Sequence, residues 1–170
     1  MNVMKRRSMI QMMGLLVGGL AFPGKVRAAG WREGQDLPLI EDFGLEGKIP
    51  ALKGRVVYLD FWASWCAPCK ASFPVLQRWH EVHAPAGLTV LAVSVDEAKE
   101  DMERFVRRAK VTFPVVRDVR QRLVASADVK TMPTAFVIDR KGKVRVVHNG
   151  FTPGDEVDLE KRIKQLLGER

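Results

Sequence analysis

The residues of this chain that could carry chemistry are its two cysteines, Cys66 and Cys69, which form a Cys-Ala-Pro-Cys motif. They lie where an apolar run ends and a helical pattern begins. A helix N-terminus presents unpaired N–H groups and a partial positive charge, which favour the reactive thiolate form of cysteine. We therefore predict that Cys66 is an exposed nucleophile. Cys69 comes round to the same side within one turn, where it can displace a partner bound to Cys66.

Apolar patterns on both sides of the motif predict the elements that position it. Residues 55–62 and 88–95 read as strands that are apolar on both faces, which is typical of central parallel strands covered by helices. Helices are predicted at 66–83, 96–110, 119–127 and from 152 to a stop at 168. Shorter extended segments are predicted at 113–117, 134–138 and 144–148. The order βαβαβαββα predicts an α/β fold with a mixed central sheet flanked by helices.

The stretch from Tyr58 to Lys70, YLDFWASWCAPCK, resembles the active site of thioredoxins, and most closely that of the exported thioredoxins of the TlpA type. The match covers residues 35–170 as an order of elements, and Pro74 stands where family members kink the active-site helix. Residues 96–110 and the flanking strand resemble the αβ unit that TlpA-type proteins insert. The resemblance implies a thioredoxin fold with this insertion, and a thiol-disulfide oxidoreductase that needs no metal or organic cofactor.

A second loop is expected to face the cysteines. Thr131-Met132-Pro133-Thr134 matches the family's loop whose proline is cis. If Pro133 is cis, the backbone of Met132 could pair with an extended substrate segment as an added strand does; an ordinary trans loop proline is the alternative. Trp65, next to the nucleophile, is predicted to form part of the docking surface.

Asp60 is a carboxylate in an otherwise apolar strand. Burial is costly for an ionised carboxylate, so we expect a raised pKa. Its place six residues before Cys66 matches the buried aspartate of thioredoxins, although many TlpA-type chains carry another residue there. We favour a catalytic role in which Asp60 accepts or relays the proton of Cys69. The alternative is a solvated or hydrogen-bonded aspartate at a strand end.

Other chemistries fit the cysteines less well. Cys66 and Cys69 precede His80 and His83 in a C-x2-C-x10-H-x2-H pattern. This spacing is shorter than that of usual zinc sites, and a helix would carry the histidines more than two turns away, so no metal site is predicted. A thiol peroxidase would have a threonine or serine three residues before its reactive cysteine, where this chain has Ala63. A redox-dependent metal-delivery or binding module is the alternative from a different class.

Residues 1–28 have the layout of an export signal. A basic start with Arg6-Arg7 precedes an apolar run of 14 residues, and Val26-Arg27-Ala28 predicts cleavage after Ala28. The remaining residues, 29–170, are expected to form the thioredoxin-like domain. The twin arginine resembles a twin-arginine signal, and the Sec route is the other choice. Because a spanning helix needs about 20 apolar residues, an uncleaved membrane anchor is the minority alternative.

The charge balance follows from this segment. The formal net charge of +8 would suggest a nucleic-acid partner, but residues 1–28 hold five of the 28 basic residues and no acid. The remaining residues hold 23 basic and 20 acidic side chains, so the net charge of the domain is only about +3. No nucleic-acid partner is predicted. The 170-residue length, with 46% hydrophobic residues, suits one domain.

These observations together predict a periplasmic protein disulfide reductase, in a compartment that tolerates disulfides. Its expected partners are protein thiols and disulfides, with apocytochrome c as one plausible target. A membrane thiol-electron donor, implied by the family and the compartment, would recharge the protein, and a monomer is expected. A thiol oxidase is the alternative direction, because Ala67-Pro68 between the cysteines does not fix the redox potential.

Overall fold

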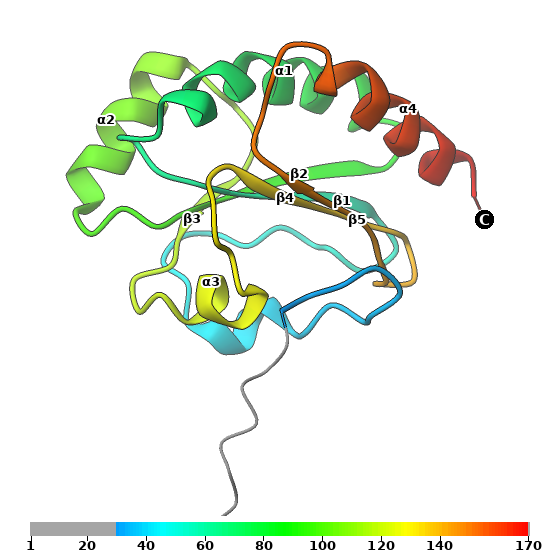
Figure 1. The fold of residues 1–170 in the computed structure, drawn as a ribbon, viewed down its shortest axis with the longest axis horizontal. Helices are drawn as coiled ribbons and strands as arrows, with labels where there is room; N and C mark the ends of the chain where they lie inside the picture. Colours follow the sequence, from blue (N-terminus) through cyan, green and yellow to red (C-terminus); the bar gives the residue numbers. More distant parts are fainter. Residues whose placement is uncertain (1–29, 170) are drawn as a thin grey trace, which may run out of the picture.

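The computed structural model describes residues 30–169 of the chain, and the predicted export signal with its cleavage site after Ala28 lies outside the described residues. A five-stranded sheet in the order β3-β2-β1-β4-β5 forms the centre (Figure 1). The strands are β1 (Val56–Trp62), β2 (Leu88–Ser94), β3 (Val115–Arg117), β4 (Thr134–Ile138) and β5 (Val144–Asn149). β1, β2 and β3 are parallel, whereas β4 is antiparallel to both β1 and β5. The predicted mixed sheet is confirmed.

Helices cover both faces of this sheet (Figure 1). α1, α2 and α4 lie on one face, and α3 lies on the other together with the N-terminal segment. The helices are α1 (Ala67–His83), α2 (Lys99–Ala109), α3 (Arg122–Ala127) and α4 (Asp155–Gly168), preceded by a short 3-10 helix, η1 (Ile40–Phe43). The order of strands and α-helices is the predicted βαβαβαββα. The α2–β3 unit extends the sheet at one edge, as the predicted insertion requires.

Aromatic packing fixes β1 against α1. All seven residues of β1 are buried, and alternate side chains of a strand share one face. On the face under α1, the Tyr58 ring meets Trp79 at 5.2 Å between centroids, and Trp62 meets Phe73 at 4.6 Å. Both contacts have edge-to-face geometry, which is favourable for aromatic pairs. The strand and the helix that flank the cysteine motif therefore pack directly against each other.

The N-terminal segment contributes to the core on the opposite face. Trp31 packs on Phe61 and Phe136, with ring centroids 6.0 and 5.0 Å apart. Ile40 in η1 is 1% exposed. The sequence patterns predicted no element before residue 55, because these apolar residues are isolated and show no strand or helix period.

Two helices begin later in the chain than predicted. α3 begins at Arg122 rather than at 119, because the Asp118 carboxylate accepts the N–H groups of Arg122 and Val124. α4 begins at Asp155 rather than at 152, because Gly154 has a left-handed φ of 103°, through which an α-helix cannot run. The Asp155 carboxylate accepts the backbone N–H and the hydroxyl of Thr152 across the turn before the helix. At the other end, α4 includes the predicted stop at 168.

α2 is shorter than the predicted 96–110. It begins at Lys99, and Asp96 stays outside it. The side chain of Asp96 is hydrogen-bonded to Ser64 and Ser94, which ties this residue to the ends of β1 and β2 instead.

Candidate active site

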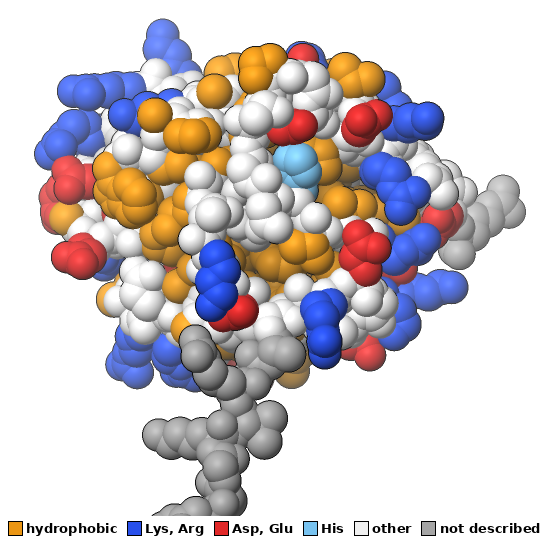
Figure 2. All heavy atoms as spheres, in the orientation of Figure 1, with side chains coloured by type: hydrophobic (Ala, Val, Ile, Leu, Met, Phe, Trp, Pro, Cys, Tyr) orange, Lys and Arg blue, Asp and Glu red, His pale blue; other side chains and the backbone are white. Residues whose placement is uncertain are grey.

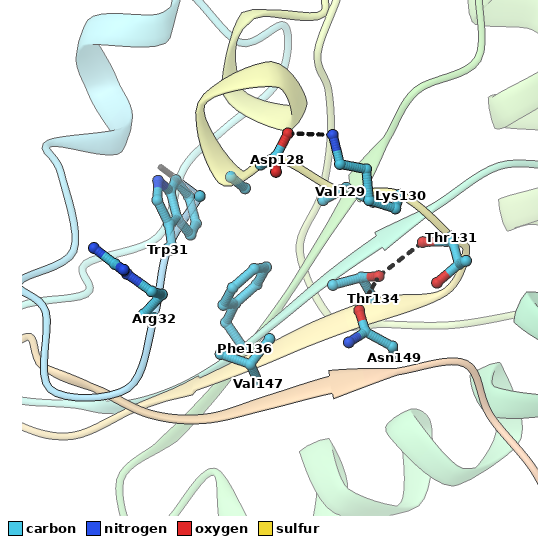
Figure 3. Close-up of a pocket in the computed structure, with 12 residues that line it drawn as sticks. Trp31, Arg32, Asp128, Val129, Lys130, Thr131, Thr134, Phe136, Val147 and Asn149 are labelled. Carbon is cyan, nitrogen blue, oxygen red and sulfur yellow. Dashed lines mark hydrogen bonds and ion pairs between the residues drawn. The ribbon is translucent and has the colours of Figure 1, made fainter. Parts of the chain in front are cut away.

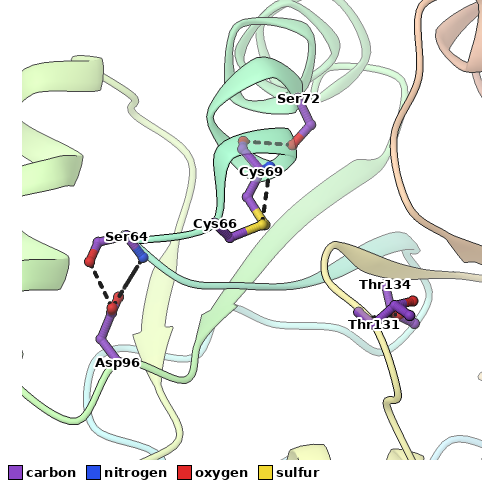
Figure 4. The surroundings of a disulfide bond; sticks show 7 residues. All are labelled: Ser64, Cys66, Cys69, Ser72, Asp96, Thr131 and Thr134. Atoms are coloured by element: carbon purple, nitrogen blue, oxygen red, sulfur yellow. Dashed lines mark hydrogen bonds between the residues drawn. A yellow bond between two sulfur atoms is a disulfide. The ribbon is translucent and has the colours of Figure 1, made fainter.

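Cys66 and Cys69 form a disulfide at the start of α1 (Figure 4). Cys66 is the N-cap residue, and its Sγ accepts the backbone N–H of Cys69 at 3.3 Å. Pro68 occupies the first turn, where a helix N–H has no intrahelical partner to lose. The predicted free exposure of Cys66 is wrong: the residue is only 5% exposed, and Cys69 is fully buried. Of the two cysteines, only Cys66 lines the groove beside the disulfide, so only Cys66 is within reach of a partner.

A buried carboxylate supports the turn before Cys66. The Cys66 N–H donates to the carbonyl of Ala63 at 3.1 Å and closes the turn. Inside it, Ser64 donates both its N–H and its hydroxyl to the carboxylate of Asp96, as Figure 4 shows. Sequence reasoning placed Asp96 in a helix and missed this contact. The available signal was its position just after β2, because the carboxyl ends of neighbouring parallel strands meet at one edge of the sheet.

A surface groove of about 450 Å³ opens beside the disulfide. One wall is formed by Trp65, Cys66 and the next two residues, and the other by residues 129–132, including Met132. The Trp65 side chain is 67% exposed. The structure therefore brings Trp65, Cys66 and Met132 together, as the sequence predicted.

The loop carrying Met132 is anchored on both sides. The Met132–Pro133 peptide bond is cis, as the resemblance implied. The carbonyl of Pro133 accepts the N–H of Gly150. The carbonyl of Thr131 accepts the hydroxyl of Thr134, as Figure 3 shows. Pro133 itself is buried and does not line the groove. The anchored backbone thus presents Met132, and not the proline ring, to the groove.

Asp60 lies within β1 and is 1% exposed, so the alternative of a solvated aspartate at a strand end is wrong. Its neighbours across the sheet are Ala92 and Ala135, and on its own face they are Tyr58 and Trp62. Oδ2 has no hydrogen-bond partner among residues 30–169. Desolvation in these apolar surroundings raises the pKa of Asp60 well above its ordinary value, as expected from the sequence.

The histidines of the rival zinc pattern lie away from the cysteines. His83, near the end of α1, is within 3.0 Å of the Glu160 carboxylate of α4. This contact is the main reason that the pKa of Glu160 falls to about 2. Within residues 30–169, no group of three or more His, Cys, Asp or Glu residues is arranged to hold a metal ion.

The surface is mixed in charge. On the face shown in Figure 2, basic side chains are spread around the periphery with acidic side chains among them. On α2, Arg104 pairs with Asp101 and Arg107 with Glu103. None of the helices between residues 30 and 169 has the length and apolar character that crossing a membrane would require.

A disulfide that joins the N-cap of a helix to its first turn, beside an open groove, can exchange with the thiols of another protein, and in its reduced dithiol form it can exchange with another protein's disulfide. On this fold, such a pair defines a thiol-disulfide oxidoreductase of the thioredoxin type. The chain belongs to the AhpC/TSA family, whose model matches residues 38–147.

Individual relatives agree with this class. The chain is 35% identical to thiol-disulfide oxidoreductase ResA of Bacillus subtilis over 141 residues, which cover 81% of this chain and 77% of ResA. A Chlorobium tepidum structure assigned as thiol:disulfide interchange protein DsbE is 36% identical, with a TM-score of 0.71. That match covers 82% of this chain and 99% of the other. A thioredoxin family thiol:disulfide interchange protein from Chlorobium tepidum TLS is 26% identical, with a TM-score of 0.62, covering 69% and 83%. The resemblance to TlpA-type thioredoxins is confirmed.

Proposed function

We propose that this oxidoreductase works as an exported protein disulfide reductase. The single observation that carries the exchange chemistry of this proposal is the asymmetry of the cysteine pair: Cys66 borders the groove, whereas Cys69 is fully buried. Only one of the two sulfurs can therefore meet a substrate, and the other is held close enough to displace it.

The reaction starts from the reduced pair. The Cys66 thiolate attacks one sulfur of a substrate disulfide, so that a Cys66–substrate disulfide forms and the other substrate sulfur leaves as a thiolate. Cys69 then loses its proton and attacks Cys66 Sγ. This second step forms the Cys66–Cys69 disulfide and releases the second substrate sulfur as a thiolate. The substrate gains two electrons and the enzyme loses two.

Asp60 is proposed as the group that takes the Cys69 proton. Asp60 is buried under α1, and its Oδ2 has no hydrogen-bond partner among residues 30–169. Its pKa is raised, which brings it closer to the neutral pH at which the enzyme would work and so suits a group that takes up and releases a proton. Asp60→Asn is expected to slow resolution of the mixed disulfide at neutral pH while leaving the first attack by Cys66 unchanged. Rapid-quench measurement of both steps tests this role. Unchanged resolution would remove Asp60 from the mechanism.

The groove is proposed to bind an extended segment of the substrate. Trp65 supplies exposed apolar surface, and the anchored backbone at Met132 could pair with the segment, with the buried Pro133 shaping the loop. Main-chain pairing selects weakly among side chains, which suits an enzyme acting on several protein disulfides. Apocytochrome c is one candidate substrate.

The direction and the cellular setting complete the proposal. Residues 1–28 would direct export to the periplasm, and a membrane thiol-electron donor would return the pair to the dithiol state. Equilibration of the purified domain with glutathione, combined with an insulin reduction assay, tests the direction. We expect a potential below the value of about −180 mV that is typical of a disulfide isomerase, together with insulin reduction. A higher potential would instead identify a thiol oxidase.

A further inference from the structure

The carboxylate of Asp96 takes no part in the exchange steps, yet its hydrogen bonds concentrate on the active-site turn. The residue is 3% exposed. Its oxygens accept the Ser64 N–H at 3.0 and 3.1 Å and the Ser64 hydroxyl at 2.8 Å. The Ser94 hydroxyl donates to Oδ2 at 2.8 Å, and the Asp96 N–H donates back to that hydroxyl oxygen at 3.0 Å. Asp96 therefore ties the end of β2 to the segment that follows β1.

The turn held in this way determines where the sulfur of Cys66 lies. Ser64 is two residues before Cys66, and the Cys66 N–H donates to the carbonyl of Ala63 across the same turn. The carbonyl of Cys66 then accepts the N–H of Lys70, and its Sγ accepts the N–H of Cys69. A shift of the turn would move Sγ away from this N–H donor.

We propose that Asp96 is a positioning residue for Cys66: by fixing Ser64 it keeps the sulfur in line with the N–H of Cys69 at the start of α1. The inference rests on the proposed function, in which Cys66 is the attacking thiol. An N–H directed at the sulfur stabilises the thiolate more than the thiol, because hydrogen bonds to charged groups are the stronger ones.

The sign of the effect separates positioning from a direct influence of charge. If Asp96 acted on Cys66 only through its negative charge, removing it would favour the thiolate, and the thiol would ionise at lower pH. If Asp96 acts by positioning, removing it weakens the N–H contact, and the thiol ionises at higher pH. Ser64→Ala removes one hydrogen bond and leaves the carboxylate in place, so it reports on positioning alone.

The experiment follows the rate of iodoacetamide alkylation of Cys66 against pH in the fully reduced protein, with mass spectrometry to assign the site. We expect Asp96→Ala to raise the pH midpoint by about one unit and Ser64→Ala to raise it by less. Asp118→Ala is the matched control, because Asp118 is also a buried acid that accepts two backbone N–H groups, but it does so at α3. Its midpoint should equal that of the wild type.

Two results would overturn the inference. The first is that Asp96→Ala leaves the pH midpoint of Cys66 alkylation unchanged or lowers it, in an experiment where the wild-type midpoint lies below that of free cysteine. The other, which decides the matter if Asp96→Ala does not fold, is an unchanged midpoint in Ser64→Ala. A wild-type midpoint near 8.5, as in free cysteine, would instead overturn the proposed function and this inference with it.

Discussion

Replacing Asp60 with asparagine tests whether burial raises the pKa of this carboxyl group, because a raised pKa makes the free energy of unfolding depend on pH. An acid whose pKa is raised by folding keeps its proton in the folded state at a pH where the unfolded chain has lost it. The folded state then binds more protons, so the free energy of unfolding falls as pH rises from the unfolded pKa, about 3.9, to the folded pKa. For one such group the slope is about 1.4 kcal/mol per pH unit, and it vanishes above the folded pKa.

Asp60→Asn removes this slope. The buried amide has its own cost, but that cost does not depend on pH. We therefore expect the stability of the variant relative to wild type to increase with pH from about 4, by up to about 1.4 kcal/mol per unit. Urea unfolding of both proteins, oxidised so that neither cysteine titrates, measures this difference across the pH range. A difference that stays constant between pH 4 and 8 would refute the argument from desolvation.

Asp139 provides a control of opposite sign. It is 8% exposed, and although burial acts to raise its pKa, the N–H of Lys143 and the guanidinium of Arg145 outweigh that effect and hold the pKa below its ordinary value. The stability contributed by Asp139 is therefore present above the unfolded pKa and is lost as pH falls. Asp139→Asn should lose stability relative to wild type at neutral pH, with the difference shrinking towards low pH.

Two further changes test separate parts of the structure. Because the pKa of Glu160 is about 2 beside His83, the Glu160 carboxylate stabilises the fold above its unfolded pKa, and this contribution is lost as pH falls from about 4.5 to 2. After allowance for its partial exposure, Glu160→Gln should cost about 1–2 kcal/mol at pH 7 and little at pH 2, measured by urea unfolding; an equal cost at both pH values would contradict the assignment. Trp65→Ala should change stability by no more than about 0.5 kcal/mol, because the side chain is exposed, while slowing insulin reduction. Unchanged insulin reduction would show that the groove does not need this ring.

The sequence predicted the elements of the fold well where apolar runs were continuous. β1 and β2 are buried along their whole length, and a run of this kind can only be a central strand or a buried helix. The N-terminal segment could not be placed in the same way. Trp31 and Ile40 contribute single side chains to the core, and their burial depends on contacts with Phe61 and other distant residues.

The active site was predictable to the extent that its residues share a motif or an unusual position. Cys66 and Cys69 belong to a recognisable motif, and Asp60 was identified because it is a carboxylate in an otherwise apolar strand. Asp96 was missed because its role depends on two strands ending side by side, and a single strand pattern does not contain that information. The burial of Cys66 was also unpredictable, since the motif contains no information about the residues that surround it in the fold.

The most direct test of the account is to capture the exchange intermediate. The reduced Cys69→Ala variant is mixed with insulin, quenched with acid and digested, and mass spectrometry locates the insulin-derived disulfide. We expect a stable adduct on Cys66, and almost none on Cys69 in the reciprocal Cys66→Ala variant, because only Cys66 borders the groove. Equal adducts in the two variants, or none in Cys69→Ala, would contradict the division of labour between the two sulfurs.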